Sequence, residues 1–419
     1  MLDRKSAPQF SALKNFQLPE PEVTRLSNGC SLVCLDIVQQ DVIKIELLFK
    51  SGKWYEPTPG ISHFTAQLLD KGIPGKTAYQ IATWFDLFGA SVEISAGLDF
   101  TSVSLYSLAS NVTEILPLFF QLVTNPAFPL DELSQAKDIF SQNLKLNLEK
   151  NSFVANRNIR KNIFGELHPY GATLDLPHLD TINPGLLHEY FKSRFIPHEV
   201  YITGKLSVPA KNMVMDALSQ FQPQALQQPV HYTAMGQQPV QLVEKPESIQ
   251  TSLRLGKRSI NRSHPQYPQL ILLNHILGGY FGSRLMKNLR EERGLTYGIH
   301  SSISPLANDS VFMIGTDVNK QDRELAISEI KNEVNSLCHK PVSKDELMLA
   351  CNHLLGGLQL DTANPFSVME KVKTIRTHDL NPEFYNNIFV KISETTPSEI
   401  NKLAQTHLTP ESLYTVAIG

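Results

Sequence analysis

Two hydrophobic periodicities alternate along the first half of the chain and predict strands and helices in turn. Period-two alternation and short apolar runs predict strands, and these cover 31–35, 42–49, 90–95 and 101–106. Helical periodicity with start and stop signals predicts helices, and these cover 63–69, 78–88, 112–123 and 131–148. This alternation predicts an α+β fold with helices on one face of a largely antiparallel sheet.

The second half of the chain repeats the first. Val200-Tyr201 aligns with Leu413-Tyr414, about half the chain later, and each pair follows a helix start of the type Thr-Pro or Thr-x-x-Pro. Such an internal repeat predicts two homologous α/β-sandwich halves. We place the N-terminal domain at 1–215, a linker rich in Gln and Pro at 216–240, and the C-terminal domain at 241–419.

Composition excludes several classes of protein. The 419 residues are 42% hydrophobic and carry a net charge of −3, which predicts a globular protein with no bias toward nucleic acid or an anionic membrane. The chain has no apolar stretch that predicts a signal peptide or a membrane span, so we expect a cytoplasmic protein. Its cysteines have neither zinc-ribbon nor redox spacing and are expected to be free thiols. They are Cys30, Cys34, Cys338 and Cys351.

Residues 59–72 have the frame of a zinc-peptidase motif without its chemistry. An inverzincin requires His-x-x-Glu-His on a helix. His63 occupies the first position, but Ala66 stands at the general base and Gln67 at the second ligand. Ala cannot transfer a proton, and zinc sites use imidazole, thiolate or carboxylate ligands, so we expect this chain to bind no metal. A histidine without such partners is more often a packed or capping side chain than a ligand.

This window resembles the M16 (pitrilysin-like, inverzincin) peptidase family, in its short-chain subfamily B. The family's spacing from Gln67 gives Leu144 at the third ligand position, and Glu149 lies five residues further along, away from the ligand face of a helix. The segment His168-Pro-Tyr-Gly171 matches a further family signature. The resemblance implies a metallopeptidase M16-like (LuxS/MPP-like) fold whose first half has a degenerate metal site.

The second half is similar to the family's glycine-rich loop and its Arg/Tyr pair. Gly278, Gly279 and Gly282 mark the loop, and Arg290 and Tyr297 have the spacing of the pair. The resemblance implies that both side chains contact the substrate backbone and the oxyanion, in trans to a zinc site in another chain. A guanidinium and a phenol both supply hydrogen-bond donors, and such donors stabilise a tetrahedral intermediate when they are preorganised.

Each of these residues also has a structural interpretation. Arg290 is followed by two glutamates and could form a surface ion pair. Tyr297 could be a half-buried core tyrosine. The glycines could form a turn for helix packing instead of a loop at a chamber rim. A phosphate loop is excluded, because no Lys-Ser/Thr follows and G-x-G-x-x-G is absent.

Three functional hypotheses follow from the sequence. In the first, the chain pairs with a zinc-bearing homologue that has an intact His-x-x-Glu-His motif, and the pair degrades unfolded peptides in a shared chamber, where the peptide adds a strand to a sheet edge. In the second, the chain is an inactive pseudopeptidase that binds peptides or scaffolds a complex. In the third, it is a lone hydrolase with a rebuilt site. The sequence leaves heterodimer and homodimer open, and the loss of the ligands argues against the third hypothesis.

Overall fold

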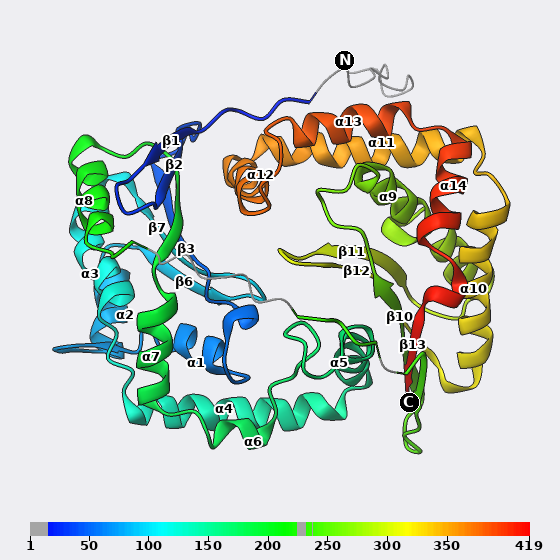
Figure 1. Ribbon diagram of the computed structural model, residues 1–419, viewed down its shortest axis with the longest axis horizontal. Coiled ribbons are helices and arrows are strands. Elements are labelled where there is room, and N and C mark those ends of the chain that lie inside the picture. Colours follow the sequence, from blue (N-terminus) through cyan, green and yellow to red (C-terminus); the bar gives the residue numbers. More distant parts are fainter. Residues whose placement is uncertain (1–15, 224–231, 237) are drawn as a thin grey trace, which may run out of the picture.

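The structure is a computed structural model that describes residues 16–223, 232–236 and 238–419. Within these ranges the chain forms two α/β halves that lie side by side (Figure 1). Helix α8 (Val208–Ser219) ends the first half and strand β9 (Val240–Val243) begins the sheet of the second. The linker expected at 216–240 falls partly on 224–231 and 237, which lie outside the described residues, as do residues 1–15.

The N-terminal half is built on a six-stranded sheet with the order β1-β2-β8-β3-β7-β6. All neighbouring strands are antiparallel except β2 and β8, which are parallel. The strands are β1 (Glu22–Arg25), β2 (Ser31–Leu35), β3 (Val42–Phe49), β6 (Ser91–Ala96), β7 (Thr101–Leu108) and β8 (Pro197–Thr203). The helices whose apolar side chains join its core are α1 (Ile61–Gln67), α2 (Ala78–Leu87), α3 (Val112–Thr124), α4 (Leu130–Glu149), α6 (Leu176–Leu179), α7 (Pro184–Arg194) and α8.

The C-terminal half repeats this plan on a five-stranded sheet with the order β11-β12-β10-β13-β9. Its only parallel neighbours within the described residues are β13 and β9, the counterparts of β8 and β2. The other strands are β10 (Gln250–Arg258), β11 (Ile299–Pro305), β12 (Ser310–Asn319) and β13 (Tyr414–Ile418). The helices around its core are α9 (Tyr267–Asn274), η3 (His275–Gly279), η4 (Met286–Glu292), α10 (Arg323–His339), α11 (Lys344–Leu360), α13 (Phe384–Glu394) and α14 (Pro397–His407).

The predicted α+β class and the mostly antiparallel sheets are confirmed. The predicted helix at 63–69 begins two residues earlier, because Gly60 takes a left-handed conformation (φ 99°) and starts the helix at Ile61. The helix starts at Pro184 and Pro397 are also confirmed, with capping side chains from Asn183 and Thr396.

Each half lends one helix to the other, which the sequence did not predict (Figure 1). Helix α5 (Asn151–Phe164) packs on strands β10 and β13 of the C-terminal sheet, and α12 (Pro365–Thr377) packs on β8 of the N-terminal sheet. Each sheet therefore carries the expected helices on one face and a helix from the other half on its opposite face. This exchange buries both faces of the central strands.

Strand β3 shows why both faces are covered. Its odd positions, such as Ile45 and Leu47, enter the core of the N-terminal half, whereas Leu48 joins a second cluster with Val368 and Val372 of α12. Side chains of a strand alternate between the two faces of its sheet. An apolar side chain such as Leu48 on the second face of a strand thus indicates that another element covers that face.

The beginning of the described chain also crosses between the halves. Phe16 is buried and belongs to the core of the C-terminal half, where its ring lies 6.2 Å from that of Tyr385 on α13. Leu18 contacts both this core and the cluster beneath α12. Residues 16–18, α5 and α12 therefore each tie the two halves together.

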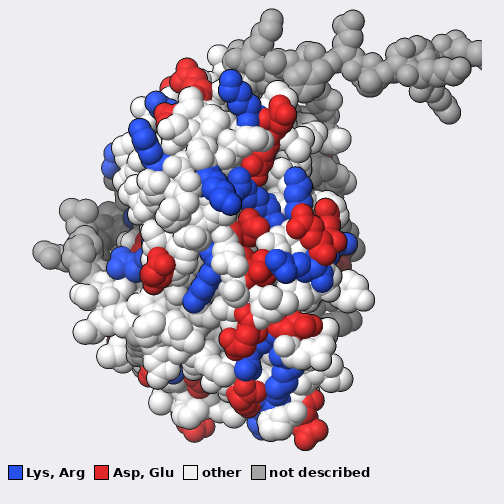
Figure 2. Space-filling model, turned by 90° about the vertical axis from the view of Figure 1, so that its right-hand side faces the viewer, with Lys and Arg blue, Asp and Glu red and all other residues white. Residues whose placement is uncertain are grey.

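The surface mixes acidic and basic side chains. Figure 2 shows the side on the right of Figure 1, where both signs alternate and no large area carries a single charge. Within the described residues, no helix combines the length and apolar character that a bilayer crossing requires. The cysteines are free, as expected, with Cys30 and Cys338 buried.

Candidate functional site

The degenerate motif lies on helix α1, which packs against the sheet through Ile61 and Phe64. His63 is on its exposed side, where its imidazole packs against aromatic rings, 5.0 Å from Phe64 and 5.6 Å from Phe140 on α4. Desolvation by these neighbours lowers the pKa of His63 below its usual 6.5. His63 is therefore an exposed histidine whose ring rests on two aromatic side chains, with its pKa shifted toward the neutral form.

Of the other two motif positions on α1, Ala66 is buried and Gln67 is half-buried. Ala66 is 2% exposed and forms part of the surface of the core. The Oε1 atom of Gln67 is buried and accepts no hydrogen bond from any described residue. Leu144 on α4 is 4% exposed. One imidazole, one amide and one aliphatic side chain thus occupy the positions of a zinc site.

These residues do not fit a zinc ion. Structural and catalytic zinc sites use at least three imidazole, thiolate or carboxylate ligands. The part of the chain that the structure describes contains no group of three His, Cys, Asp or Glu side chains with the geometry of a metal site. We therefore derive no metal-dependent step for this chain.

The three glycines of the second half occupy a compact bend after α9. A Cβ atom at Gly278 would lie 2.7 Å from the hydroxyl of Ser301 on β11, and one at Gly279 would lie 2.9 Å from Nδ1 of His275. A Cβ at Gly282 would meet the Tyr280 ring at 2.8 Å. Close approach accounts for glycine at these positions, and the backbone φ angle of none of them is positive.

Arg290 and Tyr297 lie on the surface beside this bend. Tyr297 is 92% exposed, and Arg290, on η4, is exposed with its guanidinium 4.9 Å from the centre of the Phe281 ring. Phe281 is itself 61% exposed. Neither of the two structural interpretations holds, because Tyr297 is not in the core and no ion pair of Arg290 occurs among the described residues. Both donors face solvent and can reach a ligand.

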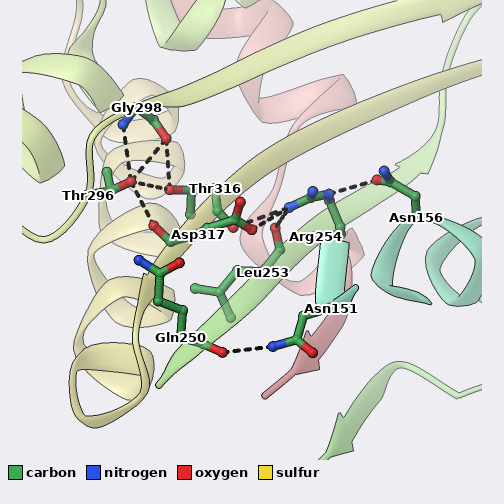
Figure 3. A network of polar contacts seen from close by, with 9 residues as sticks. All are labelled: Asn151, Asn156, Gln250, Leu253, Arg254, Thr296, Gly298, Thr316 and Asp317. Carbon is green, nitrogen blue, oxygen red and sulfur yellow. Dashed lines mark hydrogen bonds and ion pairs between the residues drawn. The ribbon is translucent and has the colours of Figure 1, made fainter. Parts of the chain in front are cut away.

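A network of hydrogen bonds holds the loop that carries Tyr297 (Figure 3). The hydroxyl of Thr296 donates to the carbonyl of Asp317 at 2.8 Å and accepts from the hydroxyl of Thr316 at 2.9 Å. The carbonyl oxygen of Gly298 lies 3.0 Å from the same Thr316 hydroxyl and is an alternative acceptor for its single proton. Tyr297 therefore stands between two residues that are fixed to strand β12.

Arg254 extends this network into the other half of the molecule. Its side chain, 8% exposed on β10, donates to the carbonyl of Thr316 at 3.2 Å and lies 3.6 Å from the carboxylate of Asp317. Its Nε donates to Oδ1 of Asn156 on α5 at 2.7 Å (Figure 3). The loop of Tyr297 is thus linked through one arginine to a helix of the N-terminal half.

Sequence reasoning missed Arg254 and Asn156. A usable signal exists in the strand 250–258, where Arg254 stands between Leu253 and Leu255. A cation that alternates with core residues must meet a polar partner on the second face of the sheet. The identity of that partner could not be read from the sequence, because Asn156 is about a hundred residues away.

The comparisons with known proteins agree with this architecture. Residues 33–174 match the family described as Insulinase (Peptidase family M16), and residues 181–354 match the one described as Peptidase M16 inactive domain. The chain belongs to the M16 peptidase family. Among its relatives, an uncharacterized zinc protease, YmxG, of Bacillus subtilis is 25% identical over 82% of this chain and 85% of its own length. One of Rickettsia bellii is 24% identical over 81% and 83%.

Solved M16 structures share the fold over almost the whole chain. A peptidase M16 inactive domain from Pseudomonas fluorescens superposes with a TM-score of 0.86 at 23% identity, over 95% of this chain and 98% of that one. The periplasmic protease PqqL of Escherichia coli superposes with a TM-score of 0.77 at 14% identity. The match covers 99% of this chain but 49% of PqqL, so this chain corresponds to about half of that protease.

Proposed function

We propose that the chain is the subunit without a metal site in a two-chain M16 peptidase. A homologue with an intact His-x-x-Glu-His motif carries the zinc, and this chain supplies Arg290 and Tyr297 to a shared chamber. The observation that carries the proposal is the contrast between the halves. Two of the three zinc-ligand positions hold Gln67 and Leu144, which do not suit zinc. In the second half, Tyr297 is exposed on a loop that is hydrogen-bonded to β12, and Arg290 is exposed on η4.

The surroundings of Tyr297 support a role in peptide binding. Strand β11 begins at Ile299, two residues after Tyr297, and forms an edge of the C-terminal sheet. An extended peptide can add to such an edge through main-chain hydrogen bonds. A peptide bound there passes Tyr297, and its reacting carbonyl lies within reach of the phenol and the Arg290 guanidinium.

The chemical contribution of this chain is electrostatic. The intact His-x-x-Glu-His motif of the partner would hold the zinc, which would supply the Lewis-acid chemistry that activates water. Here the Tyr297 hydroxyl and the Arg290 N–H groups donate to the oxygen on which negative charge develops, and donors fixed in advance lower the barrier. The network from Thr296 to Arg254 serves this purpose, because it removes conformational freedom before the substrate binds.

The test is hydrolysis of a quenched fluorescent, unstructured peptide with zinc present. Three samples are compared: this chain, a homologue from the same genome with an intact motif, and their mixture. We expect hydrolysis in the mixture that exceeds the sum of the separate rates. No gain on mixing would contradict the proposal and would favour an inactive peptide-binding protein. Hydrolysis by this chain alone would contradict the metal-free interpretation of Ala66, Gln67 and Leu144.

A further inference from the structure

A pocket of about 520 Å³ lies between α4 and α5 in the N-terminal half, next to Leu144. Three cationic side chains line it: Lys53 from the turn before α1, and Arg157 and Arg160 from α5. None of the described residues that line the pocket is Asp or Glu. The degenerate metal site thus borders a cavity with an excess of positive charge.

Only part of this charge is balanced within the protein. Arg157 forms an ion pair with Asp175, and the Lys53 ammonium donates to the carbonyl of Ala172. Nη1 of Arg160 is buried and has no hydrogen-bond partner among the described residues. A buried donor without an acceptor is costly. Nη1 of Arg160 is therefore available to donate to an anionic acceptor in the pocket.

Burial changes the ionisation of these cations in a consistent direction. Desolvation lowers the pKa of Arg160, although a guanidinium stays protonated in proteins. Desolvation also lowers the pKa of Lys53. The Glu56 carboxylate opposes this effect, and the positive charges of Arg160 and Arg157 add to it. A bound anion would relieve both the desolvation and the mutual repulsion.

The rest of the wall suits a group with a polar end and a short apolar stem. Asn143, Asn147 and Asn156 contribute amides that can donate or accept. Phe140 and Phe153 contribute aromatic surface. The volume is in the range of pockets that enclose a small ligand or a side chain.

We propose that this pocket binds a carboxylate group of a peptide, supplied by a glutamate or aspartate side chain or by the peptide's C-terminus. A guanidinium presents two parallel N–H groups that match a carboxylate. The identification of the ligand as a peptide rests on the proposed function, whereas the anion site rests on the geometry alone.

The pocket is linked to the loop of the Arg/Tyr pair. Asn156 lies in its wall and also accepts the hydrogen bond from Arg254, which contacts the carbonyl of Thr316 (Figure 3). A peptide anchored in the pocket would therefore be held next to the network that positions Tyr297. The pocket acts as a specificity site for acidic peptides in the shared chamber.

The experiment measures fluorescence anisotropy of labelled, unstructured peptides with the full chain alone. Four peptides of otherwise equal sequence carry Glu or Gln at one position and a free or amidated C-terminus. We expect the peptide without either carboxylate to bind at least about tenfold more weakly than the best of the four, since hydrogen bonds to charged groups contribute roughly 1.5–3 kcal/mol. The Glu/Gln and acid/amide comparisons identify the source of the carboxylate. Equal binding of all four peptides would overturn the proposal.

Variants assign the effect to Arg160. We expect Arg160→Gln to weaken the best peptide about tenfold or more, and Arg160→Lys to have a smaller effect because it keeps the charge but loses the planar fork. Arg25→Gln, at an exposed position on β1, is the matched control and should bind like the unmodified chain. Unchanged binding in Arg160→Gln, with an unchanged melting temperature, would overturn the assignment.

Competition with inorganic phosphate completes the test. Phosphate should displace the best peptide at millimolar concentration if the site recognises an anion, and should not displace the peptide that lacks carboxylates. Displacement of all four peptides alike would count against a carboxylate site. The binding measurements contain this chain and the peptides but no partner subunit. A negative binding result would therefore overturn the anion site without affecting the hydrolysis experiment. A negative hydrolysis result would likewise leave the anion site unaffected.

Discussion

At the scale of single residues, Arg290 and Tyr297 carry the proposed catalytic contribution. We expect Arg290→Ala and Tyr297→Phe each to lower kcat of the mixed enzyme by roughly 10²-fold, the usual loss when one oxyanion donor is removed. The measurement is initial rates at saturating peptide. Both side chains are exposed, so neither change should alter the melting temperature.

Matched controls separate this effect from a general loss of the complex. The controls are a tyrosine and an arginine of the N-terminal half that lie away from the proposed site. Tyr79 on α2 is 80% exposed, and Arg25 lies on β1. Tyr79→Phe and Arg25→Ala should keep the full rate. If Arg290→Ala and Tyr297→Phe also keep it, the assignment of the pair is wrong.

A buried histidine near the glycine bend predicts how stability depends on pH. His275 is 8% exposed, and its Nε2 lies 3.0 Å from Nδ1 of His353. Burial, and to a lesser degree His353, lowers the pKa of His275 to about 4. Between pH 4 and about 6.5 the unfolded chain binds a proton at this position and the folded chain does not. Lowering the pH through this window therefore favours unfolding, by up to about 1.4 kcal/mol per pH unit from this group.

Urea unfolding at pH 7.5, 5.5 and 4.5 measures this contribution. Other buried histidines and carboxylates titrate as well, so the informative quantity is the difference between variants. His275→Gln should reduce the loss of unfolding free energy between pH 7.5 and 4.5, whereas His300→Gln, at an exposed position on β11, should not. An equal pH dependence in both variants would exclude His275 as a contributor.

At the scale of elements, the docking of α12 depends on a buried ion pair. Glu199 on β8 is 6% exposed and accepts hydrogen bonds from Arg376 of α12 and from the hydroxyl of Tyr201. Removing one partner of a buried pair leaves the other charge uncompensated. We expect Glu199→Gln to lower the free energy of unfolding by about 2–3 kcal/mol. This loss is smaller than that for breaking a fully buried ion pair, because the Arg376 side chain is 26% exposed.

A surface pair provides the comparison for this change. Glu22 is 64% exposed in its side chain and pairs with Lys211 at 2.9 Å. Glu22→Gln should change the unfolding free energy by less than about 0.5 kcal/mol. Chemical denaturation of both variants at pH 7.5 is the measurement, and equal losses would show that α12 does not depend on Glu199.

The elements themselves were largely predictable from local signals. The alternation in 42–49 and 101–106 predicted β3 and β7, and caps such as Thr396 marked helix starts. Local backbone preference and the solvent exposure of alternate side chains act over a few residues, so they leave a trace in the sequence. The identity of the helix that covers the second face of each sheet left no such local trace in the sequence.

At the scale of the whole molecule, the exchange of helices makes each half depend on the other. Without α12, the apolar side chains of Val33, Leu35 and Leu48 would be exposed, and without the C-terminal sheet the apolar face of α5 would be. We expect neither 1–223 nor 232–419 to unfold cooperatively when expressed alone. Thermal melts followed by circular dichroism measure this.

Coexpression of the two fragments is the control for this prediction. The packing between the halves involves side chains rather than the peptide bond that joins them, so the coexpressed fragments should recover a cooperative transition. A fragment that melts cooperatively by itself, with native-like helix content, would contradict the interdependence of the halves.

The sequence by itself determined the chain's elements, its duplication and the replacement of residues in its zinc-peptidase motif. These follow from residue types at fixed local spacing: His63, Ala66 and Gln67 occupy one helical segment, and no folding can turn Ala66 into a base. Only the tertiary structure decided which face each helix covers and which distant groups meet. Arg254 and Asn156 meet because α5 packs on the C-terminal sheet, and Lys53 meets Arg157 and Arg160 because the turn before α1 lies beside α5. Such pairings depend on three-dimensional packing between segments far apart in the chain, and one sequence records no distance between them.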